Sequence, residues 1–333
     1  MAMGKSKENK YIGKESMGKR SIGEESIGKE FMGKESMGKG RRCEAVEYVD
    51  RASGKRVVES VMGDGALRFA YETLLGRTLW PVLFGSRIPS ALLGRRYDSP
   101  RSRRDIAHLA SIPGCRAEEA EKPISEYASF NDFFTRRLKP GARPVSEGFV
   151  SPADGRLMLY LGADADMPFP LKGATRTLRE VFNGDAPKGA YDIAVVRLAP
   201  VDYHRFHFPF DCATPDPVRV VPGKYHSVNP IALLRYPDVY ADNERQIVKC
   251  RAAFGDFYLV DVGAFGVGTI VQTYSGDSHA KGDEKGYFKF GGSTVIVVLR
   301  AGAVRFDDDL VRNSAAGLET RILCGEKIGK VGQ

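Results

Sequence analysis

Apolar positions recur at helical spacing in the first part of the chain. Within residues 55–125, the stretch "RVVESVMGDGALRFAYETLLGRTLWPVLF" is followed by the arginine-rich "SRIPSALLGRRYDSPRSRR". A spacing of three or four residues between apolar side chains predicts amphipathic helices. The apolar positions that carry this pattern include Val61, Leu67, Phe69, Leu74 and Leu75. We therefore expect a helical module over residues 55–125.

The pattern changes at about residue 150. Short runs of β-branched and aromatic residues now alternate with Gly, Pro and Asp, which is typical of strands separated by turns. The runs include "RLMLYLGA", "YDIAVVRLA", "FYLVDVGAFGVGTIVQTY" and "STVIVVLR". We expect a β-rich, mainly antiparallel domain over residues 126–333, and hence an α+β fold class for the whole chain.

A five-residue repeat fills residues 12–41: IGKES, MGKRS, IGEES, IGKEF, MGKES and MGKGR. Glycine at every fifth position opposes a helix, and the few Ile and Met residues cannot build a core. Residues 1–50 are therefore expected to form a low-complexity, disordered extension. A weak tether to a surface is the alternative interpretation.

The charge is concentrated at the N-terminal end. The net charge is +8, and residues 1–43 hold eleven Lys and Arg against six Glu, which accounts for +5 of it. Such an excess suits an anionic membrane or a nucleic acid, although a solvated tail explains it equally well. No signal peptide and no run of about 20 apolar residues occurs, so we expect no transmembrane helix. Trp80, Leu83 and Phe84, beside six arginines within 87–104, could instead lie on an anionic bilayer.

The five cysteines are far apart and form no CxxC pair, which indicates reduced thiols and no structural zinc. His204 and His207 stand together in "DYHRFHFPFD". Because no further set of ligands with metal spacing lies near them, we expect no metal site.

Two other residues could complete a nucleophilic site with one of these histidines. Asp154 lies in the turn "SPADG", where a carboxylate could orient a histidine. Ser293 follows Gly291 and Gly292 at the start of an apolar run. A plain hairpin explains these glycines, and so does a backbone that must bend for the serine to react. No GxSxG elbow surrounds Ser293, which argues against an α/β-hydrolase.

At this point the chain resembles the phosphatidylserine decarboxylase proenzyme family over about residues 60–330. The resemblance rests on seven motifs in family order: "FNDFFTRRLKPGARP", "SPADG", "DYHRFHFP", "HSVNP", "NER", "VGAFGVG" and "KGDEKGYFKFGGST". It implies a β-rich catalytic domain that cuts itself between Gly292 and Ser293. The products are a β-chain, 1–292, and an α-chain, 293–333, whose first residue becomes a pyruvoyl group.

The resemblance also implies a role for each candidate residue. Asp154, His207 and Ser293 form the self-cleavage triad, and His204 is the acid–base of decarboxylation. Substrate contacts are assigned to Arg205, Val228, Asn229 and Arg245. The pyruvoyl group is the cofactor, with neither pyridoxal phosphate nor a metal.

The implied partners are phosphatidylserine in an anionic membrane and the chain's own α- and β-chains; a homodimer stays open, and nucleic acid is not expected. The protein is then a peripheral membrane protein of the cytoplasmic face or of an organelle membrane. Three alternatives remain: a pyruvoyl decarboxylase with another substrate, a lipid-binding protein without activity, and a serine hydrolase.

Overall fold

The computed structural model describes residues 47–59, 87–166, 169–171, 174–224, 242–263, 270–291 and 293–332. All of them belong to one unit, Ala45–Gln333. The repeat at 12–41 and the surface residues Trp80, Leu83 and Phe84 lie outside the described residues. The disordered extension and the membrane-contact surface therefore remain predictions.

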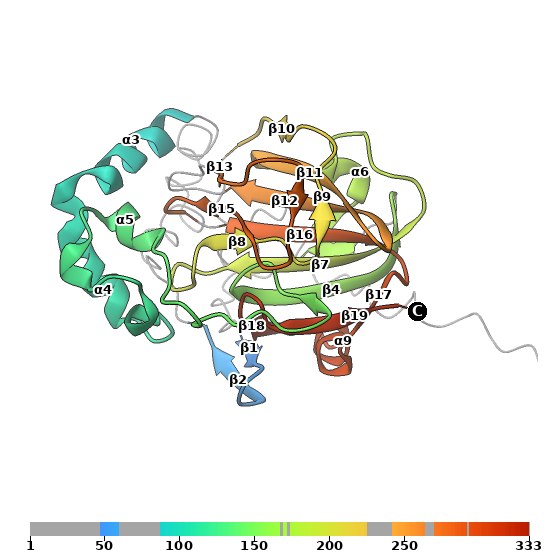
Figure 1. Cartoon of the computed structure of the whole chain (residues 1–333), viewed down its shortest axis with the longest axis horizontal. Coiled ribbons are helices and arrows are strands. Elements are labelled where there is room, and N and C mark those ends of the chain that lie inside the picture. Colours follow the sequence, from blue (N-terminus) through green and yellow to red (C-terminus); the bar gives the residue numbers. More distant parts are fainter. Residues whose placement is uncertain are drawn as a thin grey trace, which may run out of the picture. The chain divides into compact units, whose positions relative to one another are not determined.

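One large sheet organises the unit (Figure 1). All its neighbouring strands are antiparallel except β1 and β18, which confirms the predicted mainly antiparallel sheet in a mixed α+β fold. A further strand, β10 (Arg219–Val221), pairs with β11. In spatial order the other strands are β14 (Ser278–His279), β9 (Cys212–Ala213), β11 (Arg245–Ala252), β12 (Gly255–Gly263), β16 (Ser293–Arg300), β7 (Ala190–Leu198), β4 (Gly155–Asp164), β18 (Glu319–Ile322), β1 (Glu47–Asp50) and β2 (Lys55–Val58).

The central strand β16 is apolar on both faces because both faces are covered. Val295, Val297 and Leu299 pack into one buried cluster, and Ile296 and Val298 pack into another on the opposite face. A strand buried on both faces reads as a continuous apolar run rather than as an alternation. This explains the unbroken "TVIVVL" of the sequence.

Smaller sheets complete the domain. One joins β13 (Ile270–Gln272), β15 (Glu284–Phe288) and β8 (Arg205–His207), and another joins β17 (Val304–Phe306), β19 (Lys327–Val331) and β3 (Phe149–Val150). A hairpin pairs β5 (Phe169–Leu171) with β6 (Ala174–Arg176). Helix α6 (Leu178–Val181) begins with a capping box, in which Thr177 and Glu180 satisfy each other's backbone N–H groups. Helix α9 (Asp308–Ala315) contacts β4 and β18.

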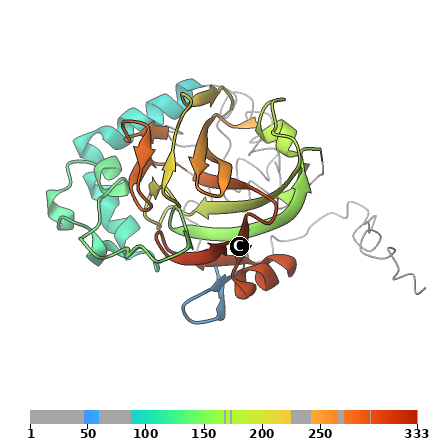
Figure 2. The same cartoon turned by 45° about the vertical axis from the view of Figure 1, so that its right-hand side comes forward.

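Short helices gather beside the sheet, as two views show (Figure 1, Figure 2). They are α3 (Arg87–Asp98), α4 (Ile106–Ser111), α5 (Phe130–Phe134) and the 3-10 helices Pro100–Asp105, Ala117–Glu119 and Ile124–Glu126. Ser129 caps α5 by accepting the N–H of Asp132. Their shared core includes Ile106, Leu109, Phe130, Phe133 and Phe134.

Residues 47–58 differ from the expectation. Part of this segment was expected to be disordered and part helical, but it forms the β1–β2 hairpin, which extends the main sheet through β18. Gly54, with φ of +67°, provides the left-handed turn residue that the hairpin needs. The apolar spacing in this segment was too sparse to distinguish a strand from a helix. Among the described residues, no helix is long and apolar enough to cross a membrane.

Candidate active site

Ser293 is the first residue of β16, between Leu198 of β7 and Gly263 of β12. It is fully buried, and its Oγ has no hydrogen-bond partner within the described part of the chain. A buried hydroxyl without a partner costs free energy, so its persistence suggests a chemical use. Gly292 lies outside the described residues.

The candidate residues lie at the same end of the sheet. Strands β4 and β16 start at this end, and β7, which lies antiparallel between them, finishes there. Asp154 directly precedes β4, and His204 follows β7. Because neighbouring strands are about 4.8 Å apart, Gly155 of β4 lies about 10 Å across the sheet from Ser293. The main chain thus brings these motifs together although up to 139 sequence positions separate them (293 − 154 = 139).

His204 is held as a neutral imidazole. Its Nδ1 lies 3.0 Å from the carbonyl oxygen of Asp202, and its ring contacts the ring of Phe134 in a tilted arrangement with a centroid separation of 3.9 Å. Burial, together with the charges of Arg136 and Arg156, lowers the pKa of His204 to about 3. If Nδ1 carries the proton, as its carbonyl partner requires, Nε2 presents a free lone pair. Nε2 has no partner among the described residues.

His207 is held differently. Its Nδ1 donates to the carbonyl oxygen of Gly282 at 2.9 Å, and its Nε2 accepts from the phenol of Tyr203 at 3.1 Å. Burial lowers the pKa of His207 as well. Both ring nitrogens are therefore occupied, and the tautomer that the two partners select leaves Nε2 as the acceptor.

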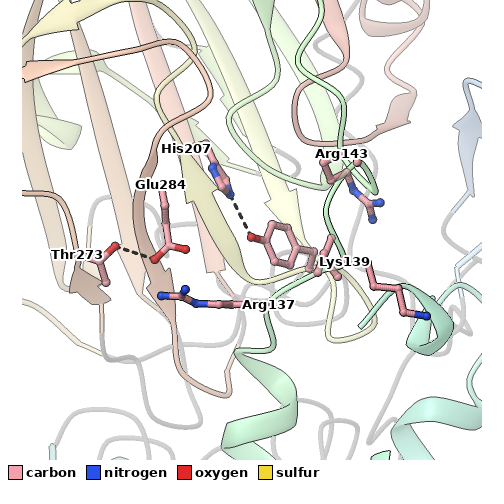
Figure 3. A pocket seen from close by; sticks show the side chains of 9 residues that line it. Arg137, Lys139, Arg143, His207, Thr273 and Glu284 are labelled. Carbon is pink, nitrogen blue, oxygen red and sulfur yellow. Dashed lines mark hydrogen bonds between the residues drawn. The ribbon is translucent and has the colours of Figure 1, made fainter. Parts of the chain in front are cut away.

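A pocket of about 490 Å³ opens beside His207 (Figure 3). Tyr203 and Glu284 line it together with basic side chains from the segment after α5, namely Arg137, Lys139 and Arg143. His207 thus borders space that water can reach, whereas Ser293 and His204 have no exposed surface.

Asp154 does not bond to His207 in this arrangement. Its carboxylate accepts two hydrogen bonds from Arg143, at 2.8 and 2.6 Å, and one from the backbone N–H of Cys324 at 2.8 Å. A bidentate arginine pair is strong and directional. The backbone of His207 is nevertheless close, because its N–H donates to the carbonyl oxygen of Pro152. The three proposed triad side chains are thus brought to one region but are not joined by hydrogen bonds.

The assigned substrate contacts have other partners here. Arg205 donates to both carboxylate oxygens of Glu284 and to the carbonyl oxygen of Thr135. Arg245 is almost fully buried and donates to the carbonyl oxygens of Glu180, Val181 and Asn243. Burial lowers the pKa of Arg245 to about 10. Val228 and Asn229 lie outside the described residues.

Sequence reasoning missed a row of buried charges beside Ser293. The strand register places the buried Arg245, Arg197 and Arg156 on one face of the sheet, together with the half-buried Arg321. The uncharged Val262 of β12 and Thr294 of β16 lie in the same line, between Arg245 and Arg197. The acids that pair with the central arginines are Glu59, Glu319 and Asp202. Since the paired residues lie far apart in the sequence, no local sequence pattern predicts these ion pairs. Within the described segments, no group of three or more His, Cys, Asp or Glu residues is placed to hold a metal ion.

Comparison with known proteins gives a consistent result. The family model for phosphatidylserine decarboxylase matches residues 130–330. The chain is 39% identical to the phosphatidylserine decarboxylase proenzyme of Chlamydia pneumoniae over 292 residues, 85% of this chain and 97% of that protein. It is also 39% identical to the proenzyme of Fusobacterium nucleatum over 294 residues, which are 86% of this chain and 98% of the relative. The region matched by the family model contains the four candidate residues Asp154, His204, His207 and Ser293. The chain therefore belongs to the phosphatidylserine decarboxylase family.

Proposed function

We propose that this protein converts phosphatidylserine to phosphatidylethanolamine and CO₂ with a pyruvoyl group made from its own Ser293. The observation that supports this most directly is the buried Ser293 Oγ, without a partner among the described residues, at the start of β16. It stands immediately after two glycines in a chain whose relatives are named phosphatidylserine decarboxylase proenzymes.

Self-cleavage uses the chain's own atoms. Ser293 Oγ attacks the carbonyl carbon of Gly292, the C–N bond breaks, and an ester replaces the peptide bond. Loss of the Ser293 α-proton then expels the Gly292 carboxylate and leaves a dehydroalanine. Tautomerisation and addition of water release ammonia and leave the pyruvoyl group. One water is consumed in total, and no external oxidant is needed.

The position of Ser293 suits a residue that becomes a chain end. Strand β16 pairs with β12 on one side and with β7 on the other, over Ser293–Arg300 in the second case. These ladders would hold the α-chain after the bond before Ser293 is cut. The new end thus stays at the end of the sheet where His204 lies.

We assign the removal of the Ser293 proton to His207, with Asp154 supporting it. Nε2 of His207 is the basic nitrogen, because Nδ1 donates to Gly282. The phenol of Tyr203 now occupies Nε2, so cleavage requires that Tyr203 move aside or pass the proton on. The pocket beside His207 gives the released proton a path to water. Asp154 acts on His207 through its nearby negative charge, which raises the pKa that burial lowers.

The pyruvoyl group supplies an electron sink for the carbanion that remains when CO₂ leaves. His204 provides the proton transfers. As a buried neutral imidazole with a free Nε2, it can take a proton from the ammonium group of the serine headgroup. It then returns a proton to the carbon that has lost CO₂.

The lipid substrate places the working enzyme at a membrane surface, as a peripheral protein. We keep Arg205, Val228, Asn229 and Arg245 as proposed headgroup contacts. Arg205 would have to exchange Glu284 for the lipid phosphate, and Arg245 would have to give up backbone carbonyls.

Intact-mass analysis tests the proposal. The purified protein should consist of two chains, 1–292 and 293–333, and the smaller should begin with a pyruvoyl group. Ser293→Ala should stay uncut and inactive, and His204→Ala should be cut but decarboxylate poorly. Vesicles containing phosphatidylserine should be turned over in preference to free serine. An uncut active chain that reacts with a fluorophosphonate probe would instead identify a serine hydrolase.

A further inference from the structure

The connection from β15, which ends at Phe288, to β16, which begins at Ser293, leads to the proposed scissile bond. The N–H of Phe288 donates to the carbonyl oxygen of His204 at 2.9 Å. Beyond this point the described part of the connection contacts α3 and α5. The contacting residues of α3 and α5 have no role in the self-cleavage steps described above.

Asn131 of α5 holds the backbone of the connection. Its Oδ1 accepts the N–H of Phe290 at 2.9 Å, and its Nδ2 donates to Asp98 of α3 at 2.9 Å. The other carboxylate oxygen of Asp98 lies 3.1 Å from Nζ of Lys289. Asn131 is 3% exposed, and because both ends of its amide have partners, the orientation of the amide is fixed.

The ring of Phe290 is held as well. Its centroid lies 4.5 Å from that of Tyr97, 4.9 Å from that of Phe130 and 5.1 Å from that of Phe134. The last two contacts are edge-to-face, a favoured geometry for aromatic pairs. The ring of Phe134 also contacts that of His204. One aromatic cluster therefore joins the connection before the scissile bond to the proposed decarboxylation base.

We propose that Asp98, Asn131, Tyr97 and Phe130, which we call the Phe290 clamp, position the connection so that Ser293 can attack Gly292. This inference rests on the proposed function. Gly291 and Gly292 have no side chains to pack, and glycine has access to more backbone conformations than any other residue. Attack on a carbonyl needs close alignment, and a misplacement of about 1 Å can cost about 100-fold in rate.

Only a short length of chain separates the clamped Phe290 from the scissile bond. Gly292 follows Phe290 by two residues, which span at most about 7 Å of chain. Fixing Phe290 therefore restricts where the Gly292 carbonyl can lie. After the cut, the same contacts retain the new end of the β-chain, since only Gly291 and Gly292 extend beyond the clamp. The clamp residues are positioning residues and take no proton.

The rate of self-cleavage tests the proposal. The full chain is made by cell-free translation, and its uncut fraction is followed with time by gel and intact mass. Asn131→Ala should slow cleavage about 10- to 100-fold. Ser129→Ala is the matched control, because it removes the N-terminal cap of the same helix but no contact with Phe290. It should lower the unfolding midpoint while leaving the cleavage rate within about twofold of the unmodified chain.

Exchanging the amide of Asn131 with the carboxylate of Asp98 distinguishes a positioning role from a general loss of folding. Asn131→Asp puts two carboxylates together and should slow cleavage. The double variant Asn131→Asp/Asp98→Asn restores one carboxylate and one amide in exchanged places, and should recover most of the rate. Hydroxylamine, which cuts an accumulated ester, should not accelerate Asn131→Ala, because that variant is slow to form the ester.

The outcomes discriminate between the two proposals. If Ser293→Ala stays uncut but Asn131→Ala is cut at the normal rate, the clamp is refuted and the proposed function stands. The clamp is also refuted if hydroxylamine restores the rate of Asn131→Ala, or if Asn131→Asp stays slow when Asp98→Asn is added. If Ser293→Ala is cut, the proposed function itself is wrong.

Discussion

Lowering the pH from about 7.5 to about 4 is expected to weaken the fold by about 3 kcal/mol through His204 alone. The pKa of this buried imidazole is lowered from 6.5 to about 3. Below about pH 6.5 the unfolded chain takes up a proton at this histidine, whereas the folded chain does not until about pH 3. Each unit of pH between these values favours unfolding by about 1.4 kcal/mol. Stability is thus complete above the unfolded pKa and is lost as the pH falls towards the folded one.

Urea unfolding measures this effect. Ser293→Ala provides a single uncut chain, whose unfolding does not depend on protein concentration, and it is compared with Ser293→Ala/His204→Asn at both pH values. The stability of the first chain relative to the second should fall by about 3 kcal/mol between about pH 7.5 and about pH 4. Other titrating groups cancel in this difference. His108→Asn, at an exposed position of α4, supplies a comparison without burial.

A relative stability that stays constant within about 0.5 kcal/mol would show that His204 gains its proton without unfolding. The imidazole would then have access to water or to an acid. Its assignment as a buried base with a free Nε2 would have to be abandoned. A loss of stability that His204→Asn does not remove would point to other buried groups.

Three further predictions concern buried groups. Lys285→Met leaves Asp261 without its buried cation and should lower the free energy of unfolding by about 3–5 kcal/mol in urea, which Lys285→Met/Asp261→Leu should partly restore. Gly286→Ala places a Cβ against the carbonyl oxygen of Val271 on the neighbouring strand, closer than the two atoms can pack, so calorimetry should show a cost of at least about 1 kcal/mol. Burial opposes ionisation of Glu59, but Arg197 and Arg156 lower its pKa below the ordinary value of 4.5. Glu59→Gln should therefore destabilise the chain at neutral pH, and by less as the pH falls below about 4.5, where the unfolded chain takes up a proton at this carboxylate before the folded chain does.

The sequence predicted the sheet better than the polar interior. Alternating and continuous apolar runs identified β4, β7, β12 and β16, because burial of side chains on one or both faces imposes those patterns. The same reasoning assigns charged residues to solvent. Lys285 and Arg197 break the rule, since each is buried and paired with an acid from another strand. Such pairs depend on strand order, which a single sequence does not reveal.

The candidate site shows the same division. The motifs predicted which side chains would carry the chemistry, but not how those side chains are held. The sequence suggested that Asp154 orients His207. In the structure, the carboxylate of Asp154 is instead hydrogen-bonded to Arg143, and the imidazole of His207 is hydrogen-bonded to Tyr203. Arg143 was already present in the motif "FNDFFTRRLKPGARP", and Tyr203 stands beside His204. Their roles depend on side-chain directions that spacing does not determine.

The direction of the first proton transfer at His204 follows from its surroundings. Desolvation and two neighbouring arginines, Arg136 and Arg156, all oppose a positive charge on the imidazole. A histidine that starts neutral cannot first act as an acid; it must accept a proton before it can give one. The serine headgroup brings an ammonium, which must lose a proton before its nitrogen can react, and a carboxylate, which the nearby arginines would attract. Arrival of that carboxylate would offset the arginine charges and make the protonated imidazole easier to form. In this proposal the substrate itself therefore supplies the proton that His204 later returns to carbon.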